Sequence, residues 1–73
     1  MFFKILYHPP GDIDSHGQEC YTWEYRGGAP RVPGECFAES YGFLTTEQAA
    51  RSDIARARKA FAAARYSKVE GPK

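Results

Sequence analysis

Apolar and polar residues alternate most regularly over residues 19–26, which read ECYTWEYR. In an extended chain, successive side chains point to opposite sides, so the three aromatic residues Tyr21, Trp23 and Tyr25 share one side. The intervening residues, which are polar or small, share the other side. This period of two predicts a strand over 19–26 with one buried face.

Two other segments carry the composition of strands. Residues 2–7 are rich in aromatic and branched residues and are ended by Pro9-Pro10-Gly11, and residues 35–41 form a third segment that is closed by Gly42. The segment 27–34 between the second and third strands holds two prolines and three glycines, so we expect a loop there. The pattern therefore predicts three strands in succession.

The apolar period changes to that of a helix after residue 45. Thr45 is a suitable N-cap, with Gln48 three residues later as in a capping box. One apolar stripe follows at helical spacing, formed by Ala50, Ile54, Ala57, Phe61 and Ala64. We expect a helix over about 46–65 and a frayed polar tail over 67–73.

These elements define one domain, residues 1–73, of the α+β class: a three-stranded antiparallel sheet with one C-terminal α-helix packed on one face. If Arg26 lies opposite Glu35 in a simple hairpin, the large aromatic residues of the second strand face small ones of the third. These small residues are Cys36, Ala38 and Ser40. The opposite face then mixes acidic and aromatic side chains, as contact surfaces do.

Charge is sorted along the chain, although the net charge is only +1. Residues 1–50 contain seven acidic and three basic residues, whereas residues 51–73 contain two acidic and seven basic ones. A field with two poles steers and orients a charged partner. No catalytic or cofactor motif accompanies this pattern, so it favours a small binding domain.

The acidic half is the first candidate site. Its carboxylates and exposed aromatic residues would face a basic partner, such as a protein that itself binds nucleic acid. The predicted contacts are Asp12, Asp14, Glu19, Glu24, Glu39, Phe37 and Tyr41. The alternative interpretation is solubilising charge on strand edges and loops, where carboxylates oppose aggregation.

The basic helix is the second candidate. A phosphate-contacting helix would use Arg51, Arg56, Arg58, Lys59 and Arg65. Cations are also favourable near a helix C-terminus without any ligand. The face between these bases is mostly alanine, which offers no base-reading amide. A third interpretation is a homodimer that joins the basic helix of one copy to the acidic sheet of another.

Metal binding and catalysis find little support in the sequence. His8, Asp12, Asp14 and His16 resemble metal ligands in type, but their spacing matches no known motif. The two cysteines, Cys20 and Cys36, are expected to be free thiols within strands. The chain is also short for a core plus an enclosed pocket. We therefore predict a protein without enzymatic activity, cofactor or metal.

No segment is apolar for long enough to span a bilayer, and Lys4 interrupts the apolar start of the chain. These features predict a soluble cytoplasmic protein that acts as a monomer and has no contact with membranes.

Residues 21–60 resemble the strand–strand–helix unit of YegP-like domains, in which a hairpin leads through a Gly-Tyr or Gly-Phe turn into a helix. Tyr41-Gly42-Phe43 and Thr45 carry this resemblance, and the long loop 27–34 departs from it. The resemblance implies a fold more than an activity.

As a whole, the short, motif-free and charge-polarised chain also resembles phage-encoded anti-CRISPR proteins, those of type I-C in particular. That resemblance implies a non-enzymatic inhibitor in a bacterial host cell. Such an inhibitor binds a CRISPR-Cas surveillance complex and blocks target DNA by mimicking it.

Overall fold

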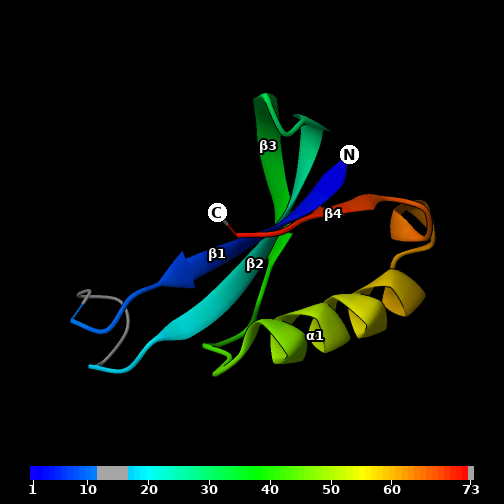
Figure 1. The fold of residues 1–73 in the computed structure, drawn as a ribbon. Helices are drawn as coiled ribbons and strands as arrows, with labels where there is room; N and C mark the ends of the chain where they lie inside the picture. The colour runs from blue at the N-terminus through cyan, green and yellow to red at the C-terminus, as the bar shows by residue number, and fades with distance from the viewer. Residues whose placement is uncertain (12–16, 73) are drawn as a thin grey trace.

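The computed structural model describes residues 1–11 and 17–72. One sheet and one helix make up the fold, with the helix across a single face of the sheet (Figure 1). The elements in chain order are β1 (Phe2–His8), β2 (Cys20–Ala29), β3 (Val32–Glu39), α1 (Glu47–Ala60), the short 3-10 helix η1 (Ala62–Ala64) and β4 (Lys68–Glu70). The α+β class is confirmed, but the sheet has four strands in the order β3-β2-β1-β4.

The fourth strand corrects the expectation of a frayed tail over 67–73. β4 pairs in parallel with β1, with Phe3 opposite Val69, so the sheet is mixed and not purely antiparallel. Val69 is half-buried and packs against the core, which ties this part of the chain down. Three residues with a single apolar position are too short to show a period in the sequence.

The hairpin between β2 and β3 also differs from the prediction. The strands continue through most of the expected loop 27–34 and leave only Pro30 and Arg31 in the turn. Gly28 allows this, because its φ is +75° and an added Cβ would lie 2.5 Å from the Val32 carbonyl oxygen. The glycines therefore serve close strand pairing here and not an open loop.

Irregular pairing shifts the predicted register of this hairpin. Tyr25 lies opposite Ala38 instead of Cys36, and Arg26 lies opposite Cys36 instead of Glu35. The extra residues in β3 form bulges, which change the side of the sheet on which a residue lies. The predicted packing of large against small residues holds for Ala38, which borders the core, whereas Cys36 is exposed.

The core lies between the sheet and the helix. Phe3 lies at the centre of the core. The centroid of its ring is 4.5 Å from that of Tyr25 and 5.6 Å from that of Trp23. The buried cluster comprises Phe3, Ile5, Trp23, Tyr25, Ala50, Ile54 and Ala64. Trp23 Nε1 donates a hydrogen bond to Asp53 Oδ2 over 2.7 Å, which joins sheet and helix through a polar group. The small residues of α1 allow the helix to approach these large rings closely.

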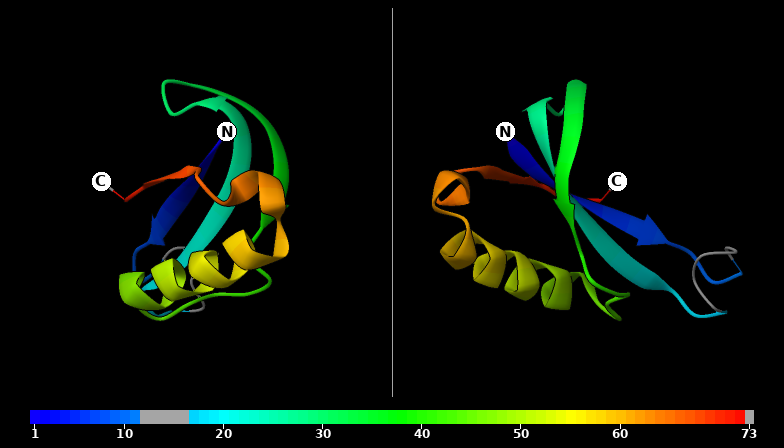
Figure 2. Two further views of the ribbon diagram at one scale, coloured as in Figure 1. Left: turned by 90° about the vertical axis from the view of Figure 1, so that its right-hand side faces the viewer. Right: turned by 180° about the vertical axis from the view of Figure 1, so that it is seen from behind.

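The ends of α1 lie inside the predicted range. Thr46, not Thr45, is the N-cap, and its hydroxyl accepts a hydrogen bond from Ala49 N at 3.0 Å. The helix stops at Ala60 because Phe61 adopts extended backbone angles, after which η1 turns the chain toward β4 (Figure 2). Phe61 is consequently 46% exposed and does not belong to the buried stripe, whereas Ala64 is fully buried.

Candidate protein-binding face

The face of the sheet opposite α1 carries a row of charged residues. Cross-strand pairing places Glu39 of β3 opposite Glu24 of β2, Glu24 opposite Lys4 of β1, and Lys4 opposite Glu70 of β4. The row therefore crosses all four strands of the sheet. It has three carboxylates and one amine, so it is acidic but interrupted.

A groove of about 310 Å³ lies beside the β3 end of this row. We call it the sheet-face groove. Its lining residues come from β1, from β2, from the end of β3 and from the segment that follows it: Leu6, His8, Thr22, Trp23, Glu24, Glu39, Ser40, Tyr41, Gly42 and Phe43. The groove thus combines carboxylates, hydroxyls and aromatic rings.

Arg26 neutralises one of the two carboxylates at the groove. Its Nε lies 3.0 Å from Glu24 Oε1 and its Nη2 lies 3.2 Å from Glu24 Oε2, a bidentate pair. Its Nη1 also donates to the Gly34 carbonyl oxygen at 3.0 Å, across the hairpin. The hydrogen bond to Glu24 raises the pKa of Arg26. Glu24 is therefore mainly committed to holding the hairpin together.

Glu39 differs from its neighbour. It is exposed and, within residues 1–11 and 17–72, it forms no ion pair. Because one guanidinium serves two adjacent carboxylates, the pair of glutamates keeps one uncompensated negative charge. This charge lies at the edge of the sheet, where a partner can reach it.

The aromatic side of the groove is fixed by the backbone. Tyr21 and Leu44 exchange two backbone hydrogen bonds, of 2.6 and 2.9 Å, which hold the segment that follows β3 against β2. Phe43 is 48% exposed and packs edge-on against the His8 ring, while Tyr41 projects fully into solvent. His8 Nε2 lies 2.9 Å from Thr22 Oγ1. These rings give the groove an apolar wall beside its charge.

A metal site is conceivable at the same place, because ligand atoms of Glu24, Cys36 and Glu39 all lie within 4.8 Å of one another. However, the Arg26 guanidinium already pairs with Glu24 in this cluster. A metal ion would have to break that bidentate pair. The arrangement is better suited to guanidinium than to a metal ion. Of the sequence's metal candidates, Asp12, Asp14 and His16 lie outside the described residues.

The predicted acidic contacts are only partly brought together. Glu24, Glu39 and Tyr41 line the sheet-face groove. Glu19 is absent from it and instead accepts a hydrogen bond from the Tyr7 hydroxyl at 3.0 Å, which raises the pKa of Tyr7. Phe37 is exposed and lies over Gly27 on the hairpin. Asp12 and Asp14 are not described.

Sequence reasoning missed four residues of this region. Arg26 was expected on the same strand side as Glu24, but its role as the ion-pair partner of Glu24 was not anticipated. His8 and Phe43 were left out of the predicted contacts, although the alternation of β1 and the turn beside Tyr41 place them nearby. Cys36 reached this side through the bulges, for which the sequence carries no clear signal.

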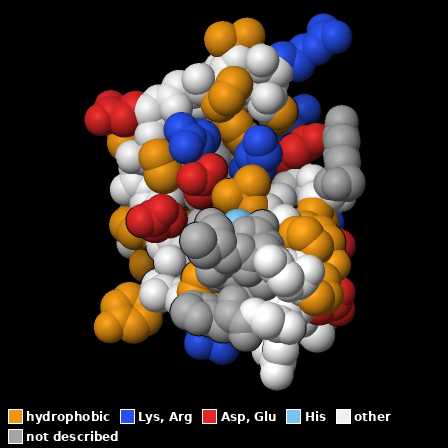
Figure 3. All heavy atoms as spheres, turned by 90° about the vertical axis from the view of Figure 1, so that its left-hand side faces the viewer, with side chains coloured by type: hydrophobic (Ala, Val, Ile, Leu, Met, Phe, Trp, Pro, Cys, Tyr) orange, Lys and Arg blue, Asp and Glu red, His pale blue; other side chains and the backbone are white. Residues whose placement is uncertain are grey.

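The view along the sheet in Figure 3 shows the same mixture. Among the residues drawn in colour, acidic, basic and apolar side chains are intermingled on this side of the molecule (Figure 3).

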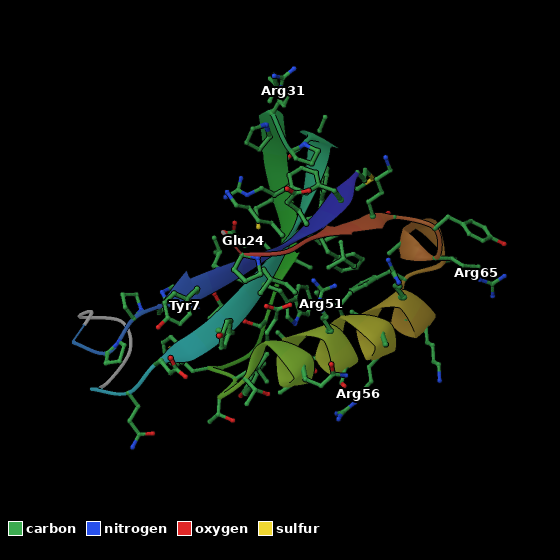
Figure 4. The ribbon with its side chains drawn as sticks, viewed as in Figure 1. Tyr7, Glu24, Arg31, Arg51, Arg56 and Arg65 are labelled. Atoms are coloured by element: carbon green, nitrogen blue, oxygen red, sulfur yellow. The ribbon has the colours of Figure 1, made fainter. Side chains whose placement is uncertain are left out.

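The basic candidate residues do not share one face. Arg58 is half-buried: it donates a hydrogen bond to the Ser67 carbonyl oxygen, and its guanidinium lies 5.8 Å from the centre of the Phe3 ring. Arg51 pairs with Glu47 at 2.9 Å and lies beside Gly71. Figure 4 shows Arg51 and Arg56 on opposite sides of α1. Of the five predicted phosphate contacts, Arg58 is thus engaged with the segment before β4 and Arg51 with Glu47 of the same helix.

A second hollow, of about 460 Å³, lies between β1, the hairpin turn and the residues after β4. Its charged residues are Lys4, Arg31 and Glu70. They come from three separate elements and carry both signs, so they define no particular ligand.

Comparison with known proteins found no matching family model, no matching curated protein and no matching solved structure. Within the described part of the chain, no helix has both the length and the apolar character needed to cross a membrane.

Proposed function

We propose that this protein is a non-enzymatic binding domain that docks a cationic surface of a partner protein on its sheet-face groove. Glu39 would meet an arginine or lysine of the partner, and Tyr41 and Phe43 would supply apolar contact around that charge. The observation that carries the proposal is the exposed Glu39 carboxylate beside exposed rings. Arg26 pairs with Glu24, and Glu39 forms no ion pair within the described residues.

The energetics favour recognition of a few groups over imitation of a whole DNA strand. Hot spots of protein interfaces are aromatic or charged anchors surrounded by near-neutral contacts. Lys4 and Arg26 reduce the field of the acidic row, so long-range attraction is modest. A single charge with flanking rings is sufficient for such an anchor.

The resemblance to anti-CRISPR proteins supplies the partner. Under it, the groove would bind a CRISPR-Cas surveillance complex on its basic DNA-binding surface, and the protein would exclude target DNA. This would take place as a monomer in the cytoplasm of a bacterial cell, with no cofactor. Excluding DNA by occupying part of its site does not require a continuous acidic surface.

A charge reversal with a matched control tests the proposal. Glu39→Lys changes the groove, while Glu35→Lys makes the same change on the same exposed strand outside it. Binding to a purified type I-C surveillance complex would be measured by biolayer interferometry, and target DNA by mobility shift. We expect Glu39→Lys to weaken binding at least about tenfold and to restore DNA binding. Glu35→Lys should behave like the wild type.

Two results would count against it. Equal losses of affinity in Glu39→Lys and Glu35→Lys would show that binding depends on the net charge and not on the groove. No binding of the wild type to the complex would remove that partner, and a lysate capture compared between the two variants would then test the groove itself.

Nucleic-acid binding by the whole of α1 is less well supported, because Arg58 donates a hydrogen bond to the Ser67 carbonyl oxygen and Arg51 is paired with Glu47. The remaining exposed bases belong to a different surface.

A further inference from the structure

The connection from α1 to β4 forms a corner of the molecule that is both basic and aromatic. We define the basic aromatic corner by five residues at the end of α1, in the connection and at the start of β4: Lys59, Phe61, Arg65, Tyr66 and Lys68. Figures 1 and 2 show η1 and its flanking turns at one end of the fold, and Figure 4 shows Arg65 there, directed away from the sheet.

Both rings of the corner are open to solvent. Tyr66 is 90% exposed and Phe61 is 46% exposed, although an aromatic ring gains free energy on burial. The cations Lys59, Arg65 and Lys68 are exposed as well. No ion pair involves them in the described segments, and residues 54–69 contain no acidic residue.

The fold holds these side chains outward by anchoring the residues between them. Ala64 is fully buried, so the turn that follows it must place Arg65 and Tyr66 at the surface. Arg58 fixes the other side of the turn through the Ser67 carbonyl oxygen. The exposure of the rings is therefore built into the backbone path.

We propose that the basic aromatic corner binds single-stranded nucleic acid. Unpaired bases stack on exposed aromatic rings, and nearby cations contact the phosphates between them. The corner presents two rings and three cations within ten residues. It has no set of amides for reading base edges, so binding should depend little on sequence.

Duplex DNA and membranes fit this corner less well. The bases of a duplex are already stacked on one another, so the two rings would have no faces to contact. A helix that lies in a membrane interface needs a free apolar face. The apolar stripe of α1 is already packed against the sheet through Ala50 and Ile54.

This inference goes beyond the proposed function and is independent of it. None of the five corner residues lines the sheet-face groove. Binding at each surface can therefore be measured in variants of the other surface. A result that refutes one proposal does not refute the other.

The test uses fluorescence anisotropy of a labelled oligothymidylate of about 12 nucleotides. Tyr66→Ala is compared with Tyr41→Ala, which removes another highly exposed tyrosine elsewhere. Arg65→Gln is compared with Arg31→Gln, which removes a charge from the hairpin turn at a different end of the molecule (Figure 4). Circular dichroism confirms that each variant is folded, and Tyr66→Phe retains a stacking ring.

We expect Tyr66→Ala to weaken binding about fivefold or more, with Tyr66→Phe and Tyr41→Ala near the wild type. Arg65→Gln should lower the slope of log affinity against log salt by about 0.7, and Arg31→Gln should not. No binding of the oligonucleotide, or equal losses in Tyr66→Ala and Tyr41→Ala, would overturn the proposal. So would binding to phosphatidylserine vesicles with no binding to the oligonucleotide.

Discussion

Replacing Asp53 with alanine should destabilise the protein by about 1.5 kcal/mol, through the loss of one hydrogen bond. The indole Nε1 of Trp23 donates to Asp53 over 2.7 Å, and Trp23 is only 5% exposed. A hydrogen bond to a charged group contributes about 1.5–3 kcal/mol, because the buried partner is otherwise left unsatisfied. Alanine recovers up to about 0.7 kcal/mol in helix propensity. The difference between the lost hydrogen bond and the gain in helix propensity is a net loss of about 1.5 kcal/mol.

A loss of this size is measurable in a chain of 73 residues. It should lower Tm by about 6–12 °C, at roughly 4–8 °C for each kcal/mol in a domain of this length. Urea unfolding followed by far-UV circular dichroism gives the free energy directly. Asp53→Asn, which keeps an acceptor oxygen but loses the charge, should cost about half as much.

A double-mutant cycle with Trp23→Phe isolates this bond. The coupling between Trp23→Phe and Asp53→Ala should be at least about 1 kcal/mol, since either change removes the same interaction. Ser52→Ala, at the exposed neighbouring position, should stay within about 0.5 kcal/mol of the wild type. A coupling energy near zero would refute the reasoning, because the bond would then contribute nothing to stability.

Three further predictions concern the hairpin, the C-terminal strand and a titrating tyrosine. Gly28→Ala should lower the free energy of unfolding in urea by about 1–3 kcal/mol, because φ is positive and the new Cβ would lie too close to the Val32 carbonyl oxygen. At Gly42 an added Cβ meets no atom, so Gly42→Ala should lower it clearly less. Arg58→Met should speed amide exchange in β4, and unchanged exchange would contradict its role at Ser67. Tyr7 should ionise above the usual tyrosine pKa in an alkaline absorbance titration, and Glu19→Gln should lower that pKa. Since the hydrogen bond favours the neutral phenol, its contribution to stability is present below pH of about 10 and is lost as pH rises through the raised pKa.

The sequence predicted those parts of the fold that local patterning determines. The alternation around Trp23 gives a strand whose aromatic side is buried, and the spacing of Ala50 and Ile54 gives a helix packed on that side. β4 could not be predicted, because its three residues become a strand only by pairing with β1. Phe61 continues the helical period, yet the chain must leave the helix there to reach that pairing position.

The sequence likewise predicted the part of the candidate site that depends on the alternation of side chains along each strand. Glu24 and Glu39 share a face because their strands alternate, and a register shift by two residues preserves the face of each residue. The bulges near Cys36 and the ion pair of Arg26 depend on how the two strands fit together, which the sequence does not show. Arg58 appeared free for phosphates because nothing in the sequence indicated that the segment before β4 would lie beside it.

The parallel pairing of β1 with β4 has a consequence for how the chain folds. Phe2 pairs with Lys68, so one side of the inner strand β1 has no neighbour until almost the whole chain has been assembled. Contacts between such distant positions form late, because the entropy of closing the intervening chain must be overcome first. Until then the bare side of β1 can template pairing with another molecule. We expect the yield on refolding to fall with increasing protein concentration, and to fall further when the hold on the final strand is weakened.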